Sequence, residues 1–128
     1  MRMTPEQWDA LVAHAREDAP NECCGLLWGR DGVVEEVERA ENKRNSPYGF
    51  ELTGQTLIKA NDLDDDGFEI GIYHSHPRSA PEPSQTDINL AQYPHWTWLI
   101  VSLRTEEGEV RAWKIAEGAV SEEPIEVA

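Results

Sequence analysis

Residues 68–87 read FEIGIYHSHPRSAPEPSQTD and decide how the chain is interpreted. The apolar first half predicts a buried strand from Phe68 to His76. A proline-rich loop follows, and Ser84 is a good N-cap for a helix that covers about residues 85–92. A strand, a loop and a helix in this order are typical of α/β proteins, in which ligands gather at the carboxyl ends of strands.

The same stretch carries a candidate metal site. His74 and His76 stand two positions apart on the expected strand, so their side chains share one face. Asp87 falls in the first turn of the following helix and points back toward the strand end. Two imidazoles and one carboxylate suit zinc, with a fourth position left for water. The same ligand set also describes non-haem iron sites, so iron stays open.

Three other interpretations compete for the two histidines. The simplest is a loop without metal, because isolated H-x-H pairs are common. An amidohydrolase barrel needs about 250 residues, and this chain has 128. Cytidine-deaminase chemistry requires H-x-E with C-x-x-C, and the chain has no C-x-x-C.

Outward from this centre, strands and helices are interspersed. Helices are expected from Thr4 to before Pro20 and from Thr53 to about Leu63. Further strands are expected at residues 23–28, 33–40, 48–52, 96–103, 110–115 and near 120. The pattern predicts an α/β fold with a mixed sheet flanked by helices, and one domain over residues 1–128.

Composition narrows the function classes. The formal net charge is −14, from 25 acidic and 11 basic residues. Such a surface repels phosphate backbones, so nucleic acid is not expected as a partner. No apolar run is long enough to span a membrane, and the first residues lack the apolar region of a signal peptide. A cytoplasmic location is therefore expected. The acidity fits general solubility, a salty cytoplasm or a basic protein partner.

The two cysteines, Cys23 and Cys24, are adjacent. Neighbours on a strand point to opposite faces, and a disulfide between them would be strained. Buried packing in a reducing compartment is expected for both, and a redox-sensitive thiol near the site is the alternative.

Two motifs of the chain resemble those of a known family. HSHP at residues 74–77 followed by PSQTD at residues 83–87 is similar to the signature of the JAMM (Mov34/MPN) metallopeptidases. PNECCGLL at residues 20–27 looks like the family's first strand, P-x-E-x-C-G-L-L, and the likeness covers nearly the whole chain. It implies a cytidine-deaminase-like JAMM/MPN fold, with one zinc ion held by His74, His76 and Asp87.

The resemblance also implies roles for two further residues. Glu22 corresponds to the family's glutamate, which takes a proton from the attacking water and passes it to the departing amine. Ser84 corresponds to the serine that donates to the oxyanion, although its position also suits a plain helix cap. Ser75 is expected to face away from the metal and to play a structural part.

The small bacterial members that this chain most resembles cut after the C-terminal Gly-Gly of a ubiquitin-like sulfur-carrier protein. The leaving group, a single amino acid or a lysine side chain, stays open, and so does the oligomeric state. Two alternatives remain: a phage tail-assembly peptidase of the same family, and a metal-free MPN domain that acts only as an interaction scaffold.

Overall fold

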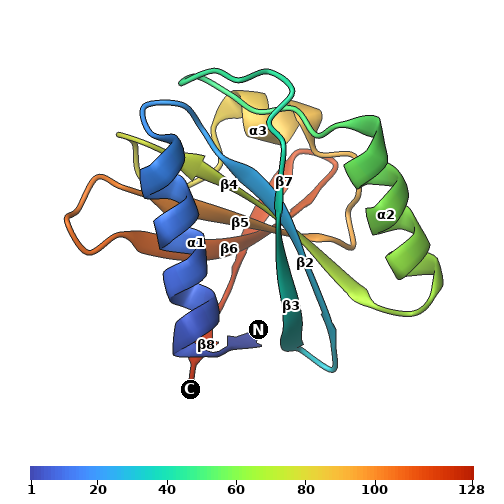
Figure 1. Ribbon diagram of the computed structural model, residues 1–128. Helices are drawn as coiled ribbons and strands as arrows, with labels where there is room; N and C mark the ends of the chain where they lie inside the picture. The colour runs from blue at the N-terminus through green and yellow to red at the C-terminus, as the bar shows by residue number, and fades with distance from the viewer.

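A mixed sheet of eight strands forms the centre of the structure, a computed structural model that describes residues 1–128 (Figure 1). The helices are α1 (Pro5–Asp18), α2 (Gly54–Asp65) and α3 (Gln85–Leu90). The strands are β1 (Arg2–Met3), β2 (Cys24–Arg30), β3 (Val33–Ala40), β4 (Glu69–His76), β5 (Thr97–Ser102), β6 (Glu109–Ala116), β7 (Ala119–Glu123) and β8 (Glu126–Val127). The order across the sheet is β7-β6-β5-β4-β2-β3-β1-β8, so β4 lies near the middle with both of its edges paired. The predicted α/β fold with a mixed sheet is confirmed.

Alternating side chains of the central strands bury two separate cores. On one face, α1 packs over a cluster that includes Leu27, Tyr73 and Leu99. On the other face, α2 packs over a cluster that includes Leu26 and Ile72. Because consecutive residues enter opposite cores, β2, β4 and β5 are buried on both faces, which explains their nearly continuous apolar sequences. By this alternation, His74 and His76 lie on the face that α2 covers.

The helix starts follow the capping chemistry read from the sequence. Thr4 caps α1 and forms a reciprocal capping box with Gln7, and Thr53 caps α2. The hairpin between β2 and β3 turns at Asp31 and Gly32, both of which have positive φ. That geometry matches the turn type for which Asp-Gly is favoured. No helix of the structure has the length and apolar character required to cross a membrane.

Two expectations about elements were wrong, and two short strands were missed. Residues 48–52 form no strand, and only isolated bridges join Asn42 to Leu52 and Ser46 to Gly49. The side chain of Asn42 takes the place of a strand partner, because it donates to the carbonyls of Glu22 and Gly49 and accepts from the N–H of Glu51. Helix α3 ends at Leu90, before residue 92. The short strands β1 and β8 pair with each other and were not predicted, because two residues give no periodicity.

Candidate active site

The carboxyl end of β4 presents its side chains alternately to the two faces of the sheet. His74 and His76 point to one face, while Ser75 points to the other and accepts a 2.8 Å hydrogen bond from the N–H of Cys23. The N–H of Ser75 in turn donates to the carbonyl of Cys23. Ser75 therefore faces away from the two imidazoles and fastens β4 to the segment that precedes β2.

This pairing also fixes the position of Glu22. Strands β2 and β4 are antiparallel, with Cys24 opposite His74. Continued by two residues, the same register brings Glu22 opposite His76. Directly opposite residues of an antiparallel pair project to the same face, so the carboxyl of Glu22 lies on the face that carries both histidines.

Asp87 reaches the histidines from the first turn of α3. Ser84 caps this helix: its hydroxyl accepts from the N–H of Asp87 at 3.1 Å, and its own N–H donates to Asp87 Oδ2 at 2.9 Å. The loop between β4 and α3 is held by Ser102, whose hydroxyl donates to the carbonyl of Ser79 at 2.6 Å. The predicted cap at Ser84 is confirmed, and its hydroxyl hydrogen remains free to donate.

Three potential ligand atoms converge on one point. His74 Nε2 and His76 Nε2 are 3.2 Å apart, and each lies 3.1 Å from Asp87 Oδ2. Bonds of roughly 2.0–2.2 Å in a tetrahedral site imply ligand-to-ligand separations of about 3.3–3.6 Å. The triangle is therefore close to the size that a single zinc ion requires. The structure brings together the three residues that the sequence singled out as metal ligands.

A hydrogen bond orients the imidazole of His76, and aromatic stacking orients that of His74. His76 Nδ1 donates to the carbonyl of Ala80 at 2.8 Å, which leaves its Nε2 lone pair free to bind a metal. The ring of His74 stacks on Phe50, with 4.3 Å between ring centroids. Burial lowers the pKa of His74 and keeps that ring neutral, the form that binds metal.

Burial disfavours the charged forms of His76 and Asp87, but hydrogen bonding outweighs it. Bonds to Asp87 and to the carbonyl of Ala80 raise the pKa of His76. The two imidazoles hold the pKa of the Asp87 carboxyl far below its ordinary value. Asp87 is thus a carboxylate at neutral pH, as a metal ligand must be.

Glu22 carries one of two buried polar atoms of this site that have no hydrogen-bond partner, the other being His74 Nδ1. Glu22 as a residue is 7% exposed, and its Oε1 is buried without a hydrogen-bond partner. Burial raises its pKa from 4.5 to about 7, His76 and Arg44 oppose the rise, and the charge of Asp87 adds to it. A carboxyl with a pKa near neutrality can both accept and release a proton at physiological pH.

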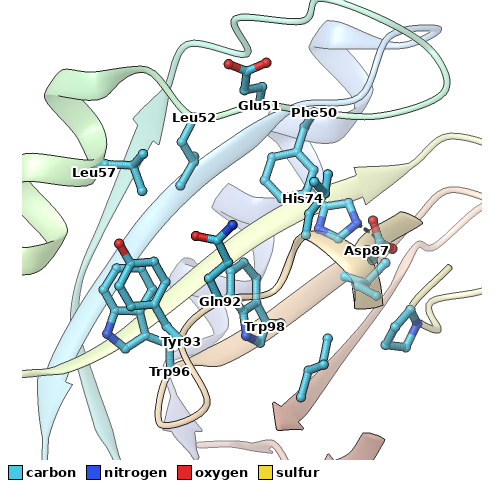
Figure 2. Close-up of a pocket in the computed structure, with 14 residues that line it drawn as sticks. Phe50, Glu51, Leu52, Leu57, His74, Asp87, Gln92, Tyr93, Trp96 and Trp98 are labelled. Atoms are coloured by element: carbon cyan, nitrogen blue, oxygen red, sulfur yellow. Dashed lines mark ion pairs between the residues drawn. The ribbon is translucent and has the colours of Figure 1, made fainter. Parts of the chain in front are cut away.

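Two cavities flank these residues. The first, of about 240 Å³, is largely apolar, and His74 and Asp87 form part of its wall. Figure 2 shows Phe50, His74 and Asp87 at one end of this cavity and Tyr93 with Trp96 at the other. The second, of about 330 Å³, is lined by Glu22 together with Pro47, Tyr48 and Arg78. The site is thus reached from two sides that differ in chemistry.

Several residues of this region were not identified from sequence. Phe50 is distant from His74 in the chain, and no local pattern signals their stacking. Arg78 lies in the proline-rich loop after β4, and no sequence motif marks it. His14, expected to be an ordinary histidine, is buried and pairs with the hydroxyl of Tyr73 at 2.6 Å, away from the site. Cys23 and Cys24 are free and buried, as expected, and burial raises the pKa of both thiols.

Comparisons with known proteins give the family. A family model described as prokaryotic homologs of the JAB domain matches residues 4–116. A CysO-cysteine peptidase of Mycobacterium tuberculosis is 39% identical in an alignment 125 residues long, and the match covers 93% of this chain and 85% of that protein. A desampylase of Pyrococcus furiosus is 36% identical over 115 residues, and the match covers 88% of this chain and 80% of that protein. The solution structure of a Desulfitobacterium hafniense protein, 35% identical, superposes with a TM-score of 0.85 over 99% of this chain and 92% of that one. The chain therefore belongs to the prokaryotic JAB-domain (JAMM/MPN) family, and it is a hydrolase of peptide or isopeptide bonds.

Proposed function

We propose that the chain is a zinc-dependent peptidase that hydrolyses the amide bond after the C-terminal Gly-Gly of a ubiquitin-like sulfur-carrier protein. The observation that carries the proposal is the convergence of His74, His76 and Asp87, with their ligand atoms 3.1–3.2 Å apart, on the face that also carries the buried carboxyl of Glu22. Residues 1–128 are proposed to act as one domain.

His74, His76 and Asp87 are the proposed ligands of one zinc ion. When bound, zinc polarises a carbonyl and lowers the pKa of water toward neutrality. The hydrogen bond from His76 to Ala80 and the stacking of Phe50 on His74 hold the two rings in the binding orientation. The reciprocal bonds between Ser84 and Asp87 do the same for the carboxylate.

Glu22 is the proposed general base and acid. Its carboxylate takes a proton from the attacking water and delivers that proton to the departing amine nitrogen, so that the leaving group is a neutral amine. Its low exposure and its pKa of about 7 suit both halves of this transfer. Ser84 is proposed to donate its hydroxyl hydrogen to the oxyanion, since its Oγ only accepts from the helix.

The substrate class follows the resemblance and is supported by relatives named CysO-cysteine peptidase and desampylase. The Phe50 ring lies over His74 and crowds one approach to the ligand atoms, so residues without side chains are expected at the cut end of the carrier. The metal-free scaffold alternative gives no reason to keep the carboxyl of Glu22 buried and unpaired, which destabilises a fold.

The test is cleavage of a ubiquitin-like sulfur carrier that extends one residue past Gly-Gly, followed by mass spectrometry. Release of that residue is expected with zinc present, and it should stop with a chelator or with Glu22→Gln. Glu107→Gln, which alters an exposed glutamate, is the matched control and should leave the rate unchanged. A carrier that ends in Ala-Ala before the extension should be cut far more slowly. Bound zinc without cleavage of the Gly-Gly carrier would refute the substrate assignment.

A further inference from the structure

Most basic side chains of this acidic protein already have partners. Six of the eleven form ion pairs: Arg2, Arg39, Lys43, Lys59, Arg104 and Arg111. Arg16 and Lys114 donate to backbone carbonyls. The remaining three, Arg30, Arg44 and Arg78, form neither an ion pair nor a side-chain hydrogen bond. These three guanidinium groups are therefore available to an anionic ligand.

Two of these three arginines lie on the Glu22 side of the active site. Arg78 lines the cavity of about 330 Å³ that Glu22 also lines. The guanidinium of Arg44 packs over Gly49, close enough that an added Cβ there would lie 2.4 Å from one of its nitrogens. Its charge reaches Glu22, whose pKa it lowers. Arg30, by contrast, stacks on Phe68 at the far end of β2.

The chemistry of the reaction assigns this side to the leaving group. The group that protonates the departing nitrogen must be within hydrogen-bond reach of it, so the leaving group binds beside Glu22. The carrier tail then occupies the side lined by His74 and Asp87. The cavity beside Glu22 falls in the lower part of the range of about 300–1,000 Å³ typical of small-ligand sites.

We propose that this cavity binds the leaving group as a single amino acid, whose free α-carboxylate is held by Arg78 with Arg44 adding to the positive field. The inference rests on the proposed peptidase function and specifies its leaving group. In a C-terminal amino acid, the carboxylate and the departing nitrogen share one carbon atom, so an arginine beside the general base can reach it. In a lysine isopeptide, the departing nitrogen ends an uncharged methylene chain and offers no anion to these arginines.

The arrangement gives a balanced reaction. The C–N bond after Gly-Gly breaks, and the water oxygen becomes part of the new carrier carboxylate. The proton that Glu22 takes from the water ends on the amino nitrogen of the released amino acid, and the second water proton is lost to solvent as the new carboxyl group ionises. A guanidinium binds a carboxylate through two parallel N–H donors. The positive charge of the two arginines also offsets the repulsion between the acidic protein surface and the negatively charged C-terminus of the substrate.

The experiment compares three substrates built on one carrier: Gly-Gly-Ala with a free carboxyl terminus, the same with a terminal carboxamide, and Gly-Gly joined to a lysine ε-nitrogen. The free acid is expected to have a kcat/KM about 10- to 100-fold higher than the carboxamide, the range of a charge-assisted hydrogen bond. Arg78→Gln should reduce kcat/KM for the acid to near that of the carboxamide and leave the carboxamide rate unchanged. Arg44→Gln should give a smaller loss of kcat/KM for the free acid, and added salt should reduce that loss by screening the charge.

Arg30→Gln removes the third arginine without an acidic partner and is the matched control, expected to leave all three substrates unaffected. The Kd of the inactive Glu22→Gln protein for the acid and the carboxamide provides a readout independent of turnover. Equal rates for acid and carboxamide, an equal loss on both in Arg78→Gln, or a preference for the isopeptide would overturn this inference while the peptidase function stands. Cleavage of none of the three would overturn the proposed function itself, and this inference with it.

Discussion

Replacing Glu22 with glutamine should remove activity and, in alkaline solution, make the metal-free fold more stable. The carboxyl is buried with an unpartnered oxygen, and its pKa rises from 4.5 to about 7. Between these two values the folded state binds more protons than the unfolded state, so the free energy of unfolding falls as pH rises. One pH unit above that pKa the carboxyl is almost fully ionised, and the loss is nearly complete.

The magnitude follows from that rise in pKa. A pKa rise from 4.5 to about 7 corresponds to about 3 kcal/mol, because one pH unit is worth about 1.4 kcal/mol. About 2.5 kcal/mol of it develops between pH 5 and pH 8, after allowance for partial ionisation of the unfolded chain at pH 5. In a domain of this size, a stability difference of about 2.5 kcal/mol shifts Tm by about 10 °C.

The assay is denaturant unfolding of the chelated proteins at pH 5 and pH 8. The stability of Glu22→Gln relative to the native protein should rise by about 2.5 kcal/mol from the lower pH to the higher. The glutamine amide contributes equally at both values, so the comparison isolates the ionisation of Glu22. Glu107→Gln, at an exposed position, should change stability by less than about 0.5 kcal/mol at either pH. A relative stability of Glu22→Gln that does not depend on pH would refute the reasoning.

Three further predictions concern other parts of the site and its support. Asp87→Asn should lower bound zinc from one per chain to well below one, measured by metal analysis after dialysis, because a neutral amide replaces the anionic ligand; full occupancy would contradict its assignment. Ser84→Asn should keep Tm within about 1 °C, since asparagine also caps helices, but should reduce kcat about 10²- to 10³-fold; an unchanged kcat would assign Ser84 to capping alone. Gly25→Ala should destabilise the fold by more than about 2 kcal/mol, because its Cβ would lie 2.1 Å from the Tyr73 ring; thermal unfolding measures this, and a near-native Tm would show that Tyr73 moves freely.

The parts of the fold that sequence predicted well are those with strong local signals. The cap at Thr4, the Asp31-Gly32 turn and the apolar strands each depend on neighbouring residues. The convergence of His74, His76 and Asp87 was also predictable, because the two histidines share a strand face and Asp87 follows a capping serine. Their meeting at 3.1–3.2 Å confirms that geometry.

The parts that sequence missed depend on contacts between distant segments. Residues 48–52 have the composition of a strand, but the side chain of Asn42 takes up their hydrogen-bonding groups. The stacking of Phe50 on His74 arises from that same loop. Whether an arginine such as Arg44 or Arg78 has an acidic partner depends on the folded positions of residues that are distant in the sequence. Neither periodicity nor motif spacing carries such information.

The most direct test of the central claim is a zinc titration of the chelated protein, with cleavage of the extended carrier and metal binding recorded on the same samples. Activity should rise in proportion to added zinc and reach its plateau at one equivalent. Glu22→Gln should bind the same single equivalent and remain inactive. Full activity in the chelated protein, or cleavage by zinc-loaded Glu22→Gln at the native rate, would contradict the account.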